Sequence, residues 1–295
     1  MSDDIITAVG TKGDQEHKRI LQKILDIGSK DRTPRPRYKD GVPAHTLSYN
    51  GELSTYDISK GEFPIITLRP IATKSAIGEI LWIYQDESSD LNLLKEKYDI
   101  NWWDNWDLGY RSIGQCYGAT VKSHNLMEGL LADIDRDPDG RRHIMDLWQV
   151  EDFIYPHGLK PCCFLTMWNV RHGENKENFL DMSLVIRSSD YATAGVINQV
   201  QYCVLHHLVA RHCGYKVGIF NVFIQNVQIY DRHIDAVKEL ISRTPIDCKP
   251  TVWLNPNKKN FYDFTIDDIK ILNYPIVDIK AKNPQITTFR DEIAI

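Results

Sequence analysis

The sequence predicts an α+β fold, a single large domain in which helices surround a mixed β-sheet. Segments with strand and helix character are interspersed without the regular alternation of a doubly wound parallel sheet. No internal repeat, low-complexity tract or Pro/Gly/Ser-rich linker divides residues 1–295. A chain of 295 residues, 42% of them hydrophobic, can bury a core without disulfides or a structural metal. We therefore expect residues 1–295 to form one domain.

The first part of the chain predicts two helices with strands between them. Apolar residues recur at helical spacing in 15–28, and Gly28 ends that helix. Residues 31–45 are rich in Pro and Arg, which predicts a loop. Short segments within 46–71, TLSY and PIITL among them, predict strands separated by polar turns. Residues 74–85 predict a buried helix, because apolar residues line one side of it.

The later part of the chain predicts three further strands and two helices. Residues 163–170 and 179–187 read as strands joined by a polar loop. Helical spacing of apolar residues predicts a helix over 196–212. A strand over 217–231 and a helix over 233–243 follow.

Composition and charge exclude several classes of protein. A net charge of −5 gives no general attraction to nucleic acid or to anionic membranes. No apolar run approaches the roughly 20 residues that span a bilayer, and the N-terminus lacks the features of a signal peptide. The six cysteines form no CxxC motif and no regular framework. We expect a cytoplasmic protein with reduced thiols, no metal ion and no membrane contact.

Cys162 becomes a candidate nucleophile through the segments around it. Alone, a cysteine after a proline indicates little, since buried cysteine commonly serves as a small apolar residue. Here the pair Arg141-Arg142 precedes Cys162, and the segment RSSD follows it at 187–190. Asn198 lies eight residues beyond that aspartate.

With these segments in this order, the sequence resembles the thymidylate synthase family from about residue 15 to the C-terminus. The most specific motifs are LKPC at 159–162, RSSD at 187–190 and Asn198. Supporting motifs are EILW at 79–82, WDNW at 103–106, QCYG at 115–118, RRHI at 141–144 and IYDRH at 229–233. The resemblance implies the fold of that family, a homodimer formed through its sheet, and methylation of dUMP to dTMP. It also implies 5,10-methylenetetrahydrofolate as one-carbon donor and reductant, with no nucleic acid needed for catalysis.

The reaction explains why a cysteine and an arginine belong together. C6 of uracil is a weak electrophile, so a thiolate adds there to make C5 nucleophilic. The resemblance assigns that thiolate to Cys162. A free thiol has a pKa of about 8.5, which nearby cations lower, and we expect Arg187 to act in this way. Cys163 stands where many members have histidine, but adjacent strand residues face opposite sides, so both thiols cannot point into one site.

The resemblance also implies a site for the nucleotide phosphate. Guanidinium groups bind phosphate through paired hydrogen bonds, which suits an acidic protein that binds a dianion. The implied phosphate ligands outside the loop are Ser188, Arg187, Arg141 and Arg142, the last two reaching across a dimer interface to the partner's nucleotide. The fourth arginine should lie in the loop 31–45, where Arg35 aligns best and Arg32 is the alternative.

Asn198 is the implied reader of the base. Its amide can donate to O4 of uracil and accept from N3–H, whereas an aspartate would suit cytosine, as in the related deoxycytidylate hydroxymethylases. The alternative interpretation is a helix N-cap, where asparagine is favoured. On the sugar side, Tyr230 is retained, but Gln228 replaces the usual histidine that binds the 3′-hydroxyl. Further departures from the family pattern are Gln225-Asn226, Ile186 and Val196-Ile197.

The remaining implied roles concern proton transfer and the folate. Glu79 lies inside an apolar helix pattern, where an unpaired carboxylate is unfavourable, and such groups are often functional. Tyr117 resembles the family tyrosine that helps to remove the C5 proton. The residues implied at the folate side are Trp103, Trp106, Asp190 and the C-terminal Ile295.

Two other functions compete with this interpretation. A pyrimidine nucleotide hydroxymethylase on the same fold would capture the exocyclic methylene with water rather than hydride. A non-catalytic RNA-binding or scaffolding relative would need none of the chemistry. The retained Trp103 and Asn198 favour methylation over the first, and the set of Cys162, Arg187, Asn198 and Glu79 favours an enzyme over the second.

Overall fold

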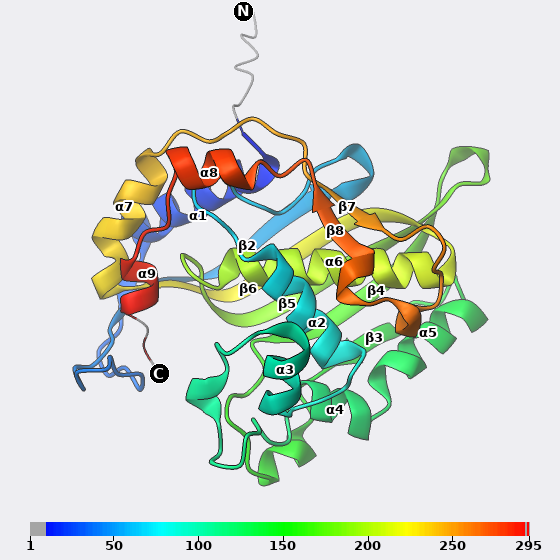
Figure 1. The fold of residues 1–295 in the computed structure, drawn as a ribbon, viewed down its shortest axis with the longest axis horizontal. Coiled ribbons are helices and arrows are strands. Elements are labelled where there is room, and N and C mark those ends of the chain that lie inside the picture. The colour runs from blue at the N-terminus through cyan, green and yellow to red at the C-terminus, as the bar shows by residue number, and fades with distance from the viewer. Residues whose placement is uncertain (1–9, 293, 295) are drawn as a thin grey trace, which may run out of the picture.

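A six-stranded mixed sheet forms the centre of this computed structural model, which describes residues 10–292 and 294 (Figure 1). The strand order is β1-β2-β6-β5-β4-β3, with β5 and β6 parallel and the other neighbours antiparallel. Its strands are β1 (Ser29–Lys30), β2 (Thr46–Asp57), β3 (His143–Asp146), β4 (Cys163–His172), β5 (Asn178–Asp190) and β6 (Lys216–Tyr230). A separate hairpin pairs β7 (Thr251–Leu254) with β8 (Ile269–Leu272). The predicted α+β class is confirmed, as are the strands predicted over 163–170, 179–187 and 217–231.

Helix α6 (Gly195–Cys213) runs across one face of this sheet (Figure 1). It is buried over most of its length because apolar residues lie on nearly every side of it. Helix α2 (Thr73–Tyr84) packs against α6, where the hydroxyl groups of Tyr84 and Tyr202 are 2.8 Å apart. Both helices were predicted from apolar spacing and are confirmed.

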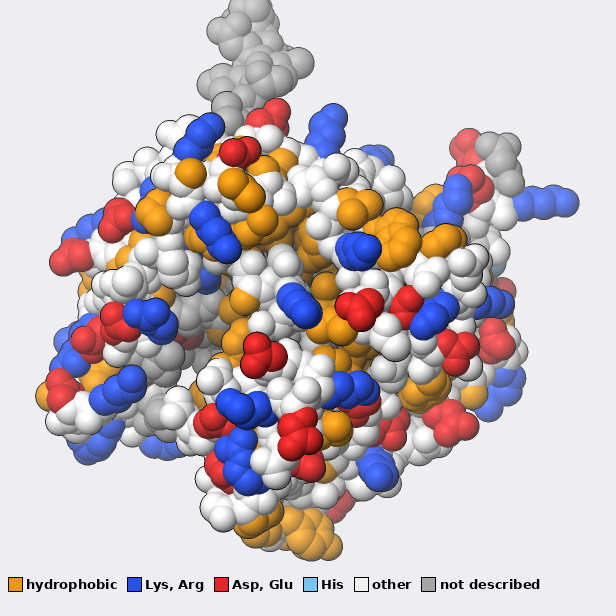
Figure 2. Space-filling view, in the orientation of Figure 1, with side chains coloured by type: hydrophobic (Ala, Val, Ile, Leu, Met, Phe, Trp, Pro, Cys, Tyr) orange, Lys and Arg blue, Asp and Glu red, His pale blue; other side chains and the backbone are white. Residues whose placement is uncertain are grey.

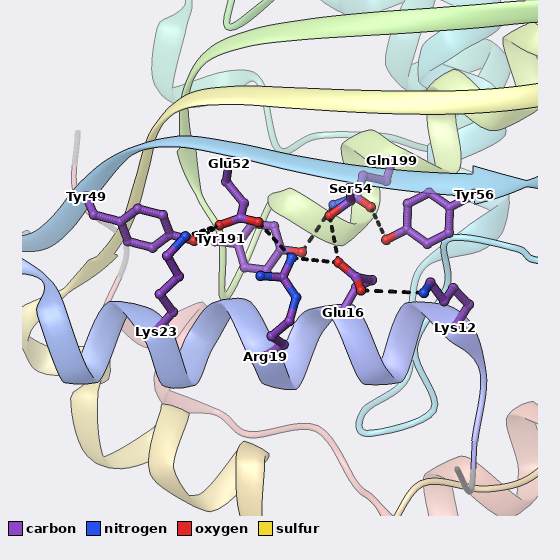
Figure 3. Close-up of polar contacts among 10 residues, drawn as sticks. All are labelled: Lys12, Glu16, Arg19, Lys23, Tyr49, Glu52, Ser54, Tyr56, Tyr191 and Gln199. Carbon is purple, nitrogen blue, oxygen red and sulfur yellow. Dashed lines mark hydrogen bonds and ion pairs between the residues drawn. The ribbon is translucent and has the colours of Figure 1, made fainter. Parts of the chain in front are cut away.

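Helix α1 (Lys12–Ile27) packs along β2 through a polar network (Figure 3). The buried carboxylate of Glu52 accepts hydrogen bonds from Arg19, Lys23 and Tyr49 at 2.6–2.8 Å. Burial raises the pKa of Glu52, but these three donors outweigh burial and leave the pKa below its ordinary value. The network therefore holds α1 on the sheet through an ionised carboxylate.

The other helices surround this core. They are α3 (Leu91–Tyr98), α4 (Gly118–Ser123), α5 (Leu126–Arg136), α7 (Ile234–Ser242), α8 (Ile276–Lys282) and α9 (Thr288–Asp291). The helices predicted over 15–28 and 233–243 correspond to α1 and α7 and are confirmed.

Residues 64–68, predicted as a strand, form none. Their backbone groups bond to side chains at the start of α1: Thr11 Oγ1 donates to the Ile65 carbonyl at 2.5 Å, and the Thr67 N–H donates to Asp14 Oδ1 at 2.6 Å. The apolar side chains are buried as their pattern indicates. The apolar pattern alone could not distinguish a strand from an irregular buried segment whose backbone bonds to side chains at the start of a helix.

In β2, β5 and β6, the regular alternation of buried and more exposed side chains is interrupted at neighbouring positions of the sheet. Inward-facing positions in β6 change from Val222 and Ile224 to Val227, and those in β5 change from Ile186 to Ser189. In the adjoining β2, Gly51 takes a positive φ of 78° and is skipped in the pairing with β6. Such irregularities redirect side chains. As a result, two adjacent residues of β5, Arg187 and Ser188, both lie outside the buried core.

Candidate active site

Cys162 lies at the entry to β4, directly after Pro161. Its neighbour Cys163 is the first residue of the strand, pairs with Ile186 of β5 and is only 4% exposed. Cys162 is the more accessible of the two. The two thiols therefore occupy different environments, as predicted from the alternation of strand residues.

Arg187 holds the segment around Cys162 in place. Its Nε and Nη2 atoms donate to the carbonyl oxygens of Pro161 and Lys160 at 2.9 and 2.7 Å. The same Nη2 atom lies 3.4 Å from the Cys162 Sγ atom. Arg187 thus places a guanidinium group beside the thiol.

The pKa of Cys162 nevertheless differs from the expectation. Burial raises the pKa of this thiol, and the opposing effects of Arg187 and the Tyr117 hydroxyl are smaller, so the pKa lies above its ordinary value. Arg187 thus acts on the thiol in the expected direction, but burial of the sulfur outweighs its effect in the free protein. Burial raises the pKa of Cys163 still further.

Tyr117 touches Cys162 from the start of α4. Its hydroxyl oxygen accepts the Cys162 N–H at 3.0 Å. Tyr117 has φ 50° and ψ −113°, a strained conformation for a bulky residue, and the next residue, Gly118, approaches the Ser88 backbone too closely for any Cβ. Burial raises the pKa of Tyr117 well above 10, so the phenol stays neutral. In this backbone conformation, the neutral Tyr117 hydroxyl lies against the backbone N–H of the candidate nucleophile, Cys162.

Glu79 is buried on α2, as predicted from the apolar helix around it. Trp102 Nε1 donates to its Oε2 atom at 2.5 Å. Burial raises the pKa of Glu79 to about 7, although the indoles of Trp103 and Trp102 and the amide of Gln201 oppose this. A carboxyl group with a pKa near neutrality suits proton transfer.

Trp103 and Trp106 form an aromatic wall beside these groups. The Trp103 ring packs edgewise on Trp106 and Tyr117, with centroids 5.4 and 5.1 Å apart. Trp103 is buried, whereas Trp106 is partly exposed. The two tryptophans predicted at the folate side therefore lie together, next to the tyrosine that touches Cys162.

Asn198 lies in the first turn of α6 and is not its N-cap, which is Ala194. The Asn198 Nδ2 atom donates to Gln201 Oε1 at 3.0 Å. The N-cap interpretation is therefore wrong, and the amide takes part in a side-chain contact one turn along the helix.

The ends of β5 and β6 bring four predicted residues together. Asp190 pairs with Gln228, and Ser188 Oγ lies 3.4 Å from Asn226 Oδ1. Burial raises the pKa of Tyr230; the charges of Asp190 and Cys162 raise it further, and that of Arg35 opposes them. The pairing of Asp190 with Gln228, two residues before Tyr230, places these side chains at one end of the two strands. The choice of Arg35 over Arg32 in the loop stays a prediction.

Arg141 and Arg142 lie elsewhere on the protomer. They are exposed and directly precede His143, which pairs with Trp168 of β4. Trp168 is six residues past Cys162, roughly 20 Å along the strand. The structure therefore does not bring these two arginines to the Cys162 of the same chain.

Asp190 is partly buried, in a charged environment that the sequence only partly predicted. Its Oδ2 atom accepts from Thr193 Oγ1 at 2.5 Å, while Oδ1 has no partner among the described residues. Arg69, which we did not predict, is also buried and donates to the carbonyl oxygens of Ala192 and Thr193 at 3.1 and 2.8 Å. Burial raises the pKa of Asp190, and His233 and Arg69 oppose it.

The chain end is anchored near this region. Arg232 donates to Glu292 Oε2 and to Asp40 Oδ2, both at 2.7 Å, and so links the loop 31–45 to the C-terminal segment. His233 Nε2 lies 3.0 Å from the Glu292 carbonyl oxygen. The predicted residue Ile295 lies outside the described residues.

Three observations concern the surface charge, metal ligands and membrane-spanning helices of the described residues. The face shown in Figure 2 carries basic and acidic side chains interspersed, without a large area of one sign. Among the described residues, no three His, Cys, Asp or Glu side chains gather into a group that could hold a metal ion. No helix in the described part of the chain is long and apolar enough to cross a membrane.

Comparison with known proteins gives one consistent result. The family described as thymidylate synthase matches residues 15–284. The thymidylate synthase of Lactococcus lactis subsp. lactis is 44% identical over 273 residues, covering 92% of this chain and 98% of the relative. That of Streptococcus sanguinis is 45% identical over 274 residues, with the same coverage. The solved structure of thermostable thymidylate synthase A from Bacillus subtilis superimposes with a TM-score of 0.85 at 34% identity, covering 96% of this chain and 99% of that one.

Proposed function

This chain belongs to the thymidylate synthase family, and from that premise we propose the part that each residue of the site takes in the reaction. The protein is a folate-dependent methyltransferase that converts dUMP to dTMP. Methylenetetrahydrofolate is the co-substrate and supplies both the carbon and the hydride. The residue roles below are supported by the contacts around Cys162.

Cys162 is the nucleophile. Its Sγ atom forms a bond to C6 of uracil, and C5 then attacks the methylene carbon of the folate. C5 then loses its proton as the bond between the new carbon and the folate nitrogen breaks, which gives an exocyclic methylene and tetrahydrofolate. Hydride from tetrahydrofolate reduces this methylene to a methyl group and leaves dihydrofolate, and the Sγ–C6 bond breaks as the C5–C6 double bond re-forms. The observation that supports this role is the position of Cys162 between Arg187, at 3.4 Å from its sulfur, and the Tyr117 hydroxyl.

Arg187, Ser188 and Arg35 bind the phosphate, and Asn198 reads the base. Arg187 still has hydrogen-bonding capacity, since its carbonyl contacts use only the Nε and Nη2 atoms. The amide of Asn198 donates to O4 and accepts from N3–H of uracil. Gln228 and Tyr230, at the end of β6, bind the sugar hydroxyl.

Glu79 and Tyr117 move protons, because one has a pKa near neutrality and the other touches the nucleophile. Trp103, Trp106 and Asp190 line the folate side. Asp190 presents a buried carboxylate oxygen without a partner among the described residues, an acceptor for a pterin N–H.

We also propose a homodimer formed through the outer face of the sheet. An apolar row crosses four strands, each of its residues paired with the next: Leu53 and Phe223, which are exposed, and Val185 and Leu165, which are partly exposed. An apolar sheet face of this kind marks an interface. Arg141 and Arg142 lie too far along β4 to serve their own Cys162, which supports their binding the phosphate in the partner's site. The proposed compartment is the cytoplasm.

The two adjacent cysteines give the sharpest test of the nucleophile. We expect Cys162→Ala to abolish formation of dTMP while dUMP binding changes by less than about tenfold, because the phosphate and base contacts remain. Cys163→Ala, the matched control, should keep most of its turnover. An active Cys162→Ala protein with an inactive Cys163→Ala protein would assign the nucleophile to Cys163.

The products test the reaction itself. Incubation with dUMP and methylenetetrahydrofolate should yield dTMP and dihydrofolate in equal amounts. Hydroxymethyl-dUMP without dihydrofolate would show that water, not hydride, captures the intermediate.

A further inference from the structure

One buried polar side chain, Gln201, contacts the proposed base reader and acts on the proposed proton-transfer group. Gln201 lies one turn after Asn198 on α6 and is only 2% exposed. Its Oε1 atom accepts from Asn198 Nδ2 at 3.0 Å. Its Nε2 atom is buried without a hydrogen-bond partner among the described residues, yet the amide acts on the carboxyl group of Glu79. Gln201 is thus hydrogen-bonded to Asn198 on a helix that packs against α2, the helix of Glu79.

The orientation of the Gln201 amide follows from the charge of Glu79. An ionised carboxylate only accepts hydrogen bonds, so it attracts the Nε2 side of the amide and repels the Oε1 side. With Nε2 toward Glu79, the Oε1 atom faces Asn198 and can bind only a donor. The Asn198 amide must then turn its Nδ2 atom toward Gln201, which is the arrangement observed.

This arrangement suits uracil and opposes cytosine. One Nδ2 hydrogen of Asn198 binds Gln201, which leaves the second for O4 of uracil and leaves Oδ1 for N3–H. Cytosine presents a donor in place of O4 and an acceptor at N3, so it requires the reversed amide. Reversal of the Asn198 amide would place its Oδ1 atom next to Gln201 Oε1, and two acceptor oxygens cannot form a hydrogen bond. Turning Gln201 as well would set its oxygen against the Glu79 carboxylate.

We propose that Gln201 is a positioning residue that orients Asn198 for uracil, and that ionised Glu79 enforces this orientation. The inference rests on the proposed role of Asn198 as base reader. It makes the choice of base depend on the charge of a group on another helix.

The dependence on pH follows from the surroundings of Glu79. Burial raises the pKa of Glu79 to about 7. The Cys163 thiol of β4 also faces it, and burial raises the pKa of Cys163 well above 9. The tyrosines around Cys163 are Tyr84 of α2, Tyr117 of α4 and Tyr202 of α6, and burial raises the pKa of each. Among these described residues, Glu79 is thus the group that changes charge near neutrality.

The unmodified protein provides the first test. We expect the ratio of the dissociation constants of dCMP and dUMP to rise about tenfold between pH 6 and pH 8.5, with a midpoint near the pKa of Glu79. The two nucleotides share phosphate and sugar, so titration of those groups cancels in the ratio. A ratio that stays constant over this range would overturn the inference.

The second test replaces the amide. In Gln201→Met, which keeps the length of the side chain, the preference for dUMP should fall about tenfold and lose its dependence on pH. Gln199→Met is the matched control. Gln199 is equally buried on α6, but its amide contacts Tyr56 and Tyr191 at 2.9 and 3.4 Å (Figure 3), so the ratio should not change. If Gln201→Met does not fold, the pH titration of the unmodified protein decides.

Asn198→Asp separates this inference from the role on which it rests. A shift of preference toward dCMP in Asn198→Asp supports Asn198 as base reader, whatever Gln201 does. An unchanged preference in that variant would overturn both. A shifted Asn198→Asp with an unchanged Gln201→Met would overturn only the role of Gln201.

Discussion

Glu79 is the residue whose ionisation should be visible in the stability of the protein. Burial raises its pKa from about 4.5 to about 7, so the folded state favours the protonated form. The carboxyl group is protonated in both states below pH 4.5 and destabilises the folded state increasingly as the pH rises toward 7. We expect Glu79→Gln to gain about 2 kcal/mol more in free energy of unfolding at pH 8.5 than at pH 5.

Denaturant unfolding at the two pH values measures this difference at a fixed protein concentration. Glu96→Gln, an exposed substitution on α3 with the same change of charge, is the control and should show no such difference. An equal effect of Glu79→Gln at both pH values would show that the carboxyl group titrates as if it were solvated.

At this scale, the sequence allowed the residues of the motifs to be predicted, but not what surrounds them. Cys162, Arg187 and Asn198 stand in recognisable segments, and the structure places Arg187 against Cys162. Gln201 and Trp102 were missed because their partner Glu79 lies far from them in the sequence, and no local pattern records such contacts. The net rise of the Cys162 pKa was missed for the same reason, since tertiary packing sets how far a sulfur is buried, whereas Arg187 lowers this pKa as expected.

At the scale of an element, two glycines test what the backbone requires. Gly51 in β2 has a φ of 78°, whereas Gly129 lies inside α5 with helical φ; a Cβ at either position meets no atom within 4 Å. An added methyl group makes no packing contact at either position, so the two substitutions differ only in the backbone conformation that alanine must adopt. We expect Gly51→Ala to lower the free energy of unfolding by about 1 kcal/mol and Gly129→Ala to raise it by about 1 kcal/mol.

Thermal or denaturant unfolding of the two variants side by side measures both signs. Effects of the same sign would contradict the positive φ assigned to Gly51 in β2. Both proteins should keep the dUMP affinity of the unmodified chain, because neither glycine touches the site.

Most long elements were predictable, although the 11-residue helix α5 was missed, and most short ones were not. The spacing of apolar residues was sufficient to predict helices α2 and α6 and strands β4 to β6. Helices α3 and α8 and the hairpin of β7 and β8 are shorter and were not predicted. The segment 64–68 has the composition of a strand, yet Thr11 and Asp14 satisfy its backbone. A partner from another element decided its conformation.

At the scale of the whole molecule, the outer face of the sheet should hold two copies together. Leu53 is 58% exposed at the edge of the apolar row, and we expect Leu53→Glu to convert the dimer to monomers, because the interface would bury unpaired charges. Sedimentation measures the mass. Val277→Glu, at an even more exposed apolar residue on α8, is the control and should leave the mass unchanged. Dissociation in both variants would show general destabilisation instead.

The sharing of arginines between protomers can be tested by mixing two inactive proteins. Cys162→Ala lacks the nucleophile, and the double variant Arg141→Ala/Arg142→Ala lacks the phosphate ligands that each chain supplies to its partner. After exchange of subunits, half of the dimers are mixed, and each mixed dimer has one intact site, with Cys162 from one chain and both arginines from the other. Activity should therefore return to about a quarter of that of the unmodified dimer at saturating substrate, as expected for a symmetric dimer. If the arginines served their own chain, every site in the mixture would lack one component. An inactive mixture with proven subunit exchange would thus place Arg141 and Arg142 outside the partner's site.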